Sequence, residues 1–269
     1  MTDQTAQPAA PNTAKIVIRD LSVAFAERGS GALLPVIDQI SLSVADGEFI
    51  CMVGPSGSGK TTLLRVLDGL QAPAGGSFVI RHDHADRPLT AMAFQGAAIF
   101  PWLTVLDNVG YGLRARNMPF VERNRIAREW IARVGLARFA DAYPHELSGG
   151  MQQRVGLARA FASNPEVLLM DEPFGALDEQ TRLILQELLL DLWQGSHTTI
   201  LFVTHSIDEA LTLGDKLIVL SARPARILSE TAITFPRPRD VLTLRADPRF
   251  GELFGSVWSL LRSEVRSGT

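Results

Sequence analysis

The chain has 269 residues, of which 46% are hydrophobic and 20% charged, and its formal net charge is -3. A chain of this size and polarity can bury a large core, so we expect one large domain or a domain with an inserted sub-domain. The slight acidity provides none of the basic surface that drives nucleic-acid affinity, so nucleic acid is not an expected partner. Because no apolar run reaches the roughly 18 residues of a membrane span and the N-terminus lacks a secretory apolar region, we predict a cytosolic chain.

The N-terminal quarter predicts a tail followed by strands. Residues 1–14 contain two prolines and no aromatic residue, so we interpret them as a disordered tail that precedes an ordered domain over 15–245. Alternating apolar residues over 16–26 and 36–43, separated by a glycine-rich turn, predict an antiparallel pair of strands. They form the entrance to the core.

A solid apolar run over 49–53 predicts a buried strand, which leads through a glycine loop into a helix that begins near Lys60. The only cysteine, Cys51, lies within this run. A lone cysteine forms no internal disulfide, and its apolar neighbours favour the interpretation of a small core residue over that of a reactive thiol.

The middle of the chain changes to helical spacing. We predict a helical sub-domain over about 96–161, inserted into an α/β core. Beyond it, apolar strands alternate with a helix over 179–193, which favours a parallel sheet covered by helices. The three strands are predicted over 167–170, 199–203 and 216–220.

The C-terminal extension, 246–269, is predicted to be helical. From Asp247 onward, apolar residues recur at the spacing of one helix face, which predicts an amphipathic helix docked on the body. These apolar residues are Phe250, Leu253, Phe254, Val257, Trp258 and Leu261.

A glycine-rich loop between the strand and the helix predicts a phosphate site. Glycines allow backbone N–H groups to turn inward around phosphate oxygens, and the helix that follows directs its positive end at the same charge. Lys60 is expected to bridge the β- and γ-phosphates of a nucleotide, and the Thr61 hydroxyl to bind Mg²⁺. The predicted nucleotide-binding residues of this segment are Gly54, Pro55, Ser56, Gly57, Ser58, Gly59, Lys60, Thr61 and Thr62.

Two carboxylates, Asp171 and Glu172, follow the apolar strand that begins at Val167. The ends of parallel strands aim side chains at the crevice where open α/β sheets bind ligands. We assign Mg²⁺ binding to Asp171, and to Glu172 the orientation of an attacking water. In isolation, such an acidic pair is more often a helix N-cap.

A third segment, 147–154, begins a helix at Ser148 and places Gly149 and Gly150 in its first turn. Bare backbone N–H groups at a helix start bind anions, but this chain already has a phosphate loop. We therefore expect this helix start to complete a nucleotide site on a second subunit. Taken alone, Ser-Gly-Gly is more often a flexible turn.

These three segments, in this order, resemble the ATP-binding subunit of an ABC transporter, and the resemblance covers roughly residues 15–265. It implies the P-loop NTPase fold of ABC ATPases: an α/β fold with a mainly parallel core sheet, an antiparallel β sub-domain and an inserted helical sub-domain. It also implies a head-to-tail homodimer that holds two ATP molecules with Mg²⁺, in which Ser148, Gly149 and Gly150 cap the γ-phosphate bound to the opposing protomer. Met151 stands where glutamine is more usual.

Further family motifs match by position. The resemblance implies that Gln95 senses Mg²⁺ and the attacking water, that His205 contacts the γ-phosphate, and that Asp178 belongs to the loop that links the two sites. Gly175 stands where serine is commoner in that loop. Phe25 is the candidate for stacking on adenine, although an alternating strand also supplies core aromatics. Three other histidines have no such context and are interpreted as solvated: His82, His84 and His145.

Two stretches, 94–109 and 221–227, resemble importer ATPases of the nitrate, sulfonate and taurine group. In this group a groove near Pro101 and Trp102 receives a helix of the membrane subunit; the alternative is a packed aromatic corner. The resemblance implies a subunit at the cytoplasmic face of the cell membrane that binds permease subunits and, through them, works with a solute-binding protein.

The predicted function is therefore ATP hydrolysis that powers import of a small solute. A soluble ABC ATPase of DNA repair or translation is less favoured, because the chain carries neither a long coiled-coil insertion nor a second cassette. A P-loop GTPase is disfavoured because no Asn-Lys-x-Asp motif occurs. A membrane system other than an importer stays open.

Overall fold

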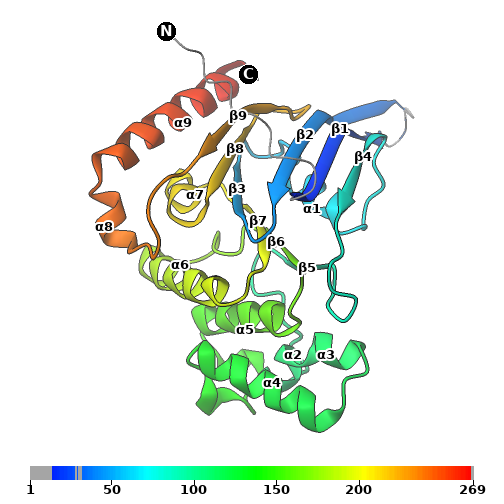
Figure 1. Cartoon of the computed structure of the whole chain (residues 1–269), viewed down its shortest axis with the longest axis vertical. Helices are drawn as coiled ribbons and strands as arrows, with labels where there is room; N and C mark the ends of the chain where they lie inside the picture. Colours follow the sequence, from blue (N-terminus) through cyan, green and yellow to red (C-terminus); the bar gives the residue numbers. More distant parts are fainter. Residues whose placement is uncertain (1–13, 28, 30–31, 268–269) are drawn as a thin grey trace.

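Figure 1 shows the computed structural model, which describes residues 14–27, 29 and 32–267. The predicted N-terminal tail lies outside the described residues except for Ala14, which begins the first strand. Two sheets form the core: one has the strand order β2-β1-β4, and the other has the order β5-β6-β7-β3-β8-β9.

The smaller sheet is antiparallel, as the alternating N-terminal pattern predicted. Both predicted strands are longer than expected, and a third strand, β4, joins them. A side chain at Gly76 in β4 would collide with the Asp20 carbonyl of β1, so glycine permits the close approach of these strands. The three strands are β1 (Ala14–Ala26), β2 (Leu33–Ala45) and β4 (Gly75–Ile80).

The larger sheet is parallel except for its last strand, β9, which pairs antiparallel with β8. This confirms the predicted mainly parallel core. The strands, in spatial order, are β5 (Thr90–Ala93), β6 (Val167–Asp171), β7 (Thr199–Val203), β3 (Phe49–Val53), β8 (Lys216–Leu220) and β9 (Ile227–Ala232).

Both faces of the parallel sheet are buried, which explains its continuous apolar strands. Along β3, Phe49 and Cys51 point into a core shared with three helices, α5 (Gly149–Ala162), α6 (Glu179–Gln194) and α7 (Ile207–Leu213). Ile50 and Met52 point into a second core shared with the smaller sheet and α1 (Lys60–Leu67). The predicted core position of Cys51 is confirmed.

One end of the molecule is helical, and Figure 1 shows α2, α3 and α4 beyond α5 at the lower end. These helices occupy the stretch in which helical spacing replaced the strand pattern; the sub-domain boundaries stay a prediction. The elements are α2 (Val105–Val109), α3 (Tyr111–Ala115), α4 (Phe120–Arg133), α5 (Gly149–Ala162) and two short 3₁₀ turns, η1 (Ala137–Phe139) and η2 (Pro144–Glu146).

Helices α6 (Glu179–Gln194) and α7 (Ile207–Leu213) cover the parallel sheet, and α8 (Val241–Arg245) and α9 (Pro248–Ser267) close the chain. Helix α9 docks on the body as predicted, with Phe250 and Val257 buried, but Trp258 is 54% exposed, so the prediction that Trp258 belongs to the docked face is wrong. At 100° per residue, Trp258 lies about 80° from the centre of the docked stripe, beyond the surface that α9 packs against α7 and β8.

A buried ion pair ties the start of β1 to the start of β6. Lys15 Nζ donates to a carboxylate oxygen of Glu166, and it also donates to Asp83 over 2.7 Å. Burial raises the pKa of Glu166, but hydrogen bonds from Lys15 and from the amides of Asp83 and His84 outweigh burial and hold that pKa below its ordinary value. Among the described residues, no helix is long and apolar enough to cross a membrane.

Candidate nucleotide-binding site

The glycine loop between β3 and α1 has the backbone that a phosphate loop requires. Gly57 and Gly59 have φ values of 74° and 101°, in the left-handed region that favours glycine. A Cβ on Gly59 would lie 3.0 Å from Val36 Cγ1 and 3.2 Å from the Val36 carbonyl oxygen. Both conformation and space therefore require glycine where the loop turns into α1.

Lys60 is buried within this loop. Its Nζ donates to the carbonyl oxygens of Gly54 and Pro55, each over 2.9 Å, and to Ser58 Oγ over 3.3 Å. Burial lowers the pKa of the Lys60 ammonium, while the nearby carboxylates of Glu172 and Asp171 oppose that change. The loop thus holds one cation at its centre, where phosphate oxygens would offer stronger acceptors than neutral carbonyls do.

The predicted metal ligands Thr61 and Asp171 are in contact. Thr61 Oγ1 donates to Asp171 Oδ1 over 2.9 Å, which places two hard oxygen donors beside the phosphate loop. Among the described residues, no cluster of three or more His, Cys, Asp or Glu side chains could hold a metal. A small oxygen set fits Mg²⁺, which takes one or two protein ligands and completes its shell with phosphates and water.

Glu172 and His205 meet at the mouth of the loop, where His205 Nε2 lies 2.5 Å from Glu172 Oε1. Glu172 has φ 47°, a strained value for a non-glycine residue and one that occurs at functional sites. Both residues line a cavity of about 170 Å³ together with Ser56, Gly57, Ser58, Gly59, Lys60, Thr61, Thr62 and Arg223. The fold thus gathers residues of three predicted motifs around one space.

Gln95 lies at an adjoining cavity of about 260 Å³, which it shares with Glu172 and His205. It does not line the phosphate-loop cavity. The structure therefore brings Gln95 to the predicted catalytic pair but not to the phosphate-loop cavity, and its contact with Mg²⁺ stays a prediction.

Ser148, Gly149 and Gly150, which we call the signature residues, line neither cavity. Ser148 caps α5 by accepting a hydrogen bond from the Met151 amide over 3.3 Å. A Cβ on Gly149 would meet nothing within 4 Å, whereas one on Gly150 would lie 2.8 Å from Thr181 Cγ2 of α6. Gly149 thus presents open backbone to the outside, whereas Gly150 is partly buried and faces Thr181 of the same chain.

Asp178 forms the N-cap of α6. Its carboxylate accepts hydrogen bonds from the Thr181 amide over 3.0 Å and from the Thr181 hydroxyl over 2.7 Å. These bonds lower the pKa of Asp178. The side chain is exposed, so a helix cap and a contact with a second subunit are compatible roles.

Phe25, the predicted adenine partner, is 40% exposed near the end of β1 and lines neither cavity. Its exposure argues against the alternative of a core aromatic. The three histidines expected to be solvated are exposed, and His82 Nε2 lies 3.2 Å from a Glu166 carboxylate oxygen.

Three polar residues at these cavities were missed by the sequence reasoning. Arg182 Nε lies 3.6 Å from Glu209 Oε1, Glu209 is buried with a raised pKa because burial disfavours its charge, and Arg223 reaches the phosphate loop. Arg223 follows β8, a parallel strand whose carboxyl end lies at the same sheet edge as the phosphate loop. That rule could have identified it.

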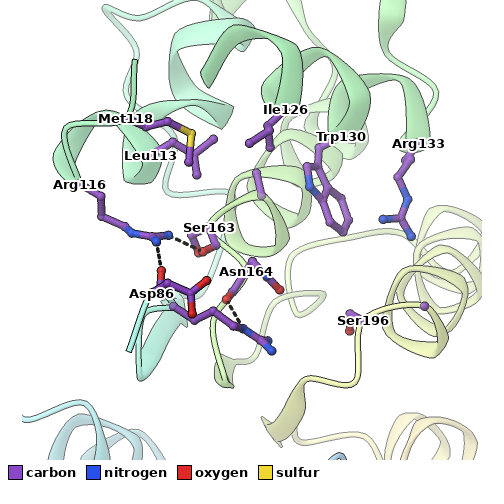
Figure 2. A pocket seen from close by; sticks show the side chains of 13 residues that line it. Asp86, Leu113, Arg116, Met118, Ile126, Trp130, Arg133, Ser163, Asn164 and Ser196 are labelled. Carbon is purple, nitrogen blue, oxygen red and sulfur yellow. Dashed lines mark hydrogen bonds between the residues drawn. The ribbon is translucent and has the colours of Figure 1, made fainter. Parts of the chain in front are cut away.

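A larger cavity, of about 500 Å³, lies away from the phosphate loop and is shown in Figure 2. Arg116 and Arg87 line it, and their guanidinium groups donate to backbone carbonyl oxygens that include those of Ser163 and Asn164, at the C-terminal end of α5. Cations that satisfy the last carbonyls of a helix stabilise it. These arginines therefore serve the fold.

Comparisons with known proteins agree with this geometry. The ABC transporter family model matches residues 37–175. An ABC transporter ATP-binding protein of Methanocaldococcus jannaschii is 45% identical over 93% of this chain and 92% of its own length. The nitrate import ATP-binding protein of Synechocystis is 41% identical over 94% and 97%, and the taurine import ATP-binding protein of Pseudomonas aeruginosa is 42% identical over 89% and 92%.

A solved dimeric ATP-binding cassette, bound to ADP and phosphate, superposes with a TM-score of 0.70 and 30% identity, covering 82% of this chain and all of that structure. The chain belongs to the ABC transporter family and has the fold of its ATP-binding cassettes, as the sequence motifs predicted.

Proposed function

We propose that this protein is the ATP-hydrolysing subunit of an ABC importer, in which two copies bind two MgATP molecules head to tail and drive membrane subunits. The observation that carries the proposal is the division of the site. Lys60, Glu172 and His205 surround one cavity, whereas the signature at Ser148 and Gly149 lies outside it. A complete site then requires the signature of a second chain.

The phosphate loop binds the triphosphate. Its backbone N–H groups and the start of α1 attract the phosphate oxygens, and Lys60 Nζ exchanges the carbonyls of Gly54 and Pro55 for the β- and γ-phosphates. Because the Lys60 ammonium is already buried, little of its hydration is lost when the nucleotide binds.

Glu172 orients the attacking water in line with the γ-phosphate, and His205 contacts the γ-phosphate from the same side. Their contact of 2.5 Å holds the carboxylate and the imidazole in one geometry. Closure of a second chain excludes water and strengthens the electrostatic interactions at the γ-phosphate.

The oxygens of Thr61 and Asp171, with Gln95, would hold Mg²⁺. When bound, this ion neutralises charge on the β- and γ-phosphate oxygens. The residues themselves position the nucleotide: Thr61 fixes the first turn of α1 against the end of β6 through its hydrogen bond to Asp171.

An apolar surface beside Gln95 supports the proposal that the chain binds a membrane subunit. A cavity of about 440 Å³ there is lined largely by apolar side chains that include Phe94, Phe100 and Tyr111. Trp102 is 71% exposed and packs on Phe100 with ring centroids 5.5 Å apart. An exposed aromatic patch of this kind suits a helix of a permease subunit better than it suits solvent.

The transported solute we propose is a small anion of the nitrate, sulfonate or taurine class, because relatives that match over most of the chain have import names of this kind. The subunit would work at the cytoplasmic face of the cell membrane, with a solute-binding protein acting through the permease.

The experiment that tests the proposal compares Mg²⁺-dependent ATP hydrolysis by the purified chain and by Glu172→Gln, with the molar mass of each measured in ATP. We expect the wild type to hydrolyse ATP and the variant to bind ATP, form dimers and lose turnover; each tenfold loss is about 1.4 kcal/mol of barrier. Near-normal turnover in Glu172→Gln would contradict the role of this residue.

A further inference from the structure

The loop that follows β8 brings a guanidinium group to the phosphate loop. Arg223 Nε and Nη2 donate to the Gly57 carbonyl oxygen over 3.2 and 3.1 Å. Arg223 also lines the cavity that contains Lys60 and Glu172. The side chain therefore adds a second cation to the rim of the space where the phosphates of a nucleotide would lie.

This cation has no carboxylate partner among the described residues. The neighbouring Arg226 pairs with Asp38, whereas the hydrogen bonds of Arg223 within the described part of the chain go only to the Gly57 carbonyl. That carbonyl accepts both bonds, so Nη1 and the charge of the guanidinium stay available to an anion in the cavity.

The loop that presents Arg223 is fixed on two sides. The Ala225 amide donates to the Val36 carbonyl over 2.8 Å, and the Asp38 amide donates to the Ala225 carbonyl over 3.0 Å, which joins the loop to β2. The Val36 segment of β2 also packs against Gly59 of the phosphate loop. One strand thus supports both the phosphate loop and the residue that reaches it.

The second support comes from the C-terminal helix. Glu264 of α9 accepts a hydrogen bond from the Ala222 amide over 3.0 Å, directly before Arg223 in the chain. Helix α9 also packs against β8, the strand from which this loop leaves. A contact chain therefore runs from α9 through Ala222 and Arg223 to Gly57.

We propose that Arg223 is a positioning residue for nucleoside triphosphate binding: it holds the Gly57 carbonyl away from the bound phosphates and adds positive charge at their edge, and α9 sets its place through Glu264. This inference rests on the proposed nucleotide site. Removal of Arg223 weakens ATP in the ground state and the transition state alike, so KM and Kd rise while kcat stays unchanged.

The test compares Arg223→Ala, Arg223→Lys and the matched variant Arg226→Ala, which removes the same charge from the same loop. The dissociation constant of a fluorescent ATP analogue and the KM and kcat for ATP are measured for each. We expect Arg223→Ala to raise Kd and KM about tenfold, as for the loss of one charge-assisted hydrogen bond, with kcat within about twofold. Arg223→Lys should recover part of the loss, and Arg226→Ala should stay within about twofold.

The dependence of KM on ionic strength distinguishes an electrostatic role of Arg223 from a purely structural one. The difference in KM between the wild type and Arg223→Ala should shrink at 1 M salt, where the Debye length falls to about 3 Å. Wild-type Kd and KM in Arg223→Ala, or an equal loss in Arg226→Ala, would overturn the proposal. A wild type that binds no ATP would overturn the proposed function itself, which distinguishes the two failures.

The role of α9 has its own variant. Glu264→Gln replaces the carboxylate that accepts from the Ala222 amide, and we expect it to raise KM about threefold because a charge-assisted acceptor becomes a neutral one. An unchanged KM in this variant, beside a tenfold rise in Arg223→Ala, would overturn the assignment of α9 to the site.

Discussion

The two glycines of the signature should respond in opposite ways to the same added methyl group. Gly149 and Gly150 are adjacent in the first turn of α5. A Cβ on Gly149 would meet nothing within 4 Å, whereas a Cβ on Gly150 would lie 2.8 Å from Thr181 Cγ2. Gly149→Ala therefore tests contacts with a second chain and its nucleotide, whereas Gly150→Ala tests packing against Thr181 of the same chain.

The magnitudes follow from these distances. Gly149→Ala adds no contact and restricts the unfolded chain, so it should stabilise the monomer by about 0.5 kcal/mol and raise Tm by about 1–2 °C. In Gly150→Ala, two carbons that prefer at least about 3.5 Å would start about 0.7 Å too close. Thr181 cannot rotate freely because its hydroxyl donates to Asp178. Overpacking should cost about 1–2 kcal/mol and lower Tm by about 3–6 °C.

The assay combines thermal unfolding without nucleotide with ATP-driven dimerisation in the Glu172→Gln background. Gly149→Ala should melt slightly above its parent yet fail to dimerise with ATP, because the methyl group would occupy the place of a phosphate of the ATP bound to the second chain. In the otherwise wild-type chain, the same change should remove most ATP turnover. A Gly149→Ala variant that dimerises and turns over normally would refute this reasoning. So would one that melts well below its parent, because then the open space at Gly149 is filled by the same chain.

Three further outcomes follow from buried groups and from the phosphate loop. Cys51 is buried, and burial raises the pKa of its thiol, so iodoacetamide at pH 8 should label the chain only after unfolding; mass spectrometry of the native protein that showed one adduct would contradict this. Lys15→Met strands the Glu166 carboxylate in the core and should cost about 3–5 kcal/mol in denaturant unfolding. Because the pKa of Glu166 is lowered in the folded chain, its contribution to stability is present above its ordinary pKa of 4.5 and is lost as the pH falls through the lower folded value. The loss of unfolding free energy on acidification should therefore be smaller in Lys15→Met than in the wild type. An equal loss in the two proteins would be inconsistent with the ion pair. Gly59→Ala should raise the Kd for ATP more than tenfold, because the new methyl group would meet Val36. The control is Gly69→Ala, at a position with φ 73° and open space, which should cost about 1 kcal/mol of stability and leave the Kd for ATP within about twofold. Equal Kd values in the two variants would show that the close approach of Gly59 to Val36 is unimportant for ATP binding.

The parallel strands could be predicted closely because each is a short apolar run buried on both faces. The predicted bounds of β3, β7 and β8 agree with the structure residue for residue. The runs stop where the chain leaves the sheet, and polar or glycine residues mark that point. The edge strand β5 ends at Ala93, and the next residue, Phe94, is 42% exposed and lines the apolar cavity.

The edge strands β4 and β9 were not predicted, and their burial explains why. Both are half-exposed, with no fully buried position, so neither has the apolar pattern of a central strand. Their pairing depends on partners far away in the sequence: Phe78 pairs with Ile18, and Glu230 with Ile218. Local sequence patterns do not predict pairing between strands that lie far apart in the sequence.

The same distinction applies to the candidate site. Motif order alone predicted that Lys60, Glu172 and His205 belong to one site, and the structure brings them around one cavity. The position of the loop after β8, at the carboxyl end of a parallel strand, marks that loop as part of the site. Which of its residues reaches Gly57 depends on how the loop docks on β2 and α9, and sequence spacing does not show that. The exposure of Trp258 likewise depends on how far the docking surface of α9 extends.

The central claim is that the chain builds half of each nucleotide site and completes it with a second copy. The most direct measurement is the molar mass of Glu172→Gln by light scattering, with and without ATP, in the presence and absence of the Gly149→Ala change. We predict a monomer without nucleotide, a dimer of twice that mass with ATP, and a monomer with ATP when Gly149→Ala is also present. A chain that binds ATP tightly and stays monomeric, or a dimer that forms regardless of Gly149, would contradict it.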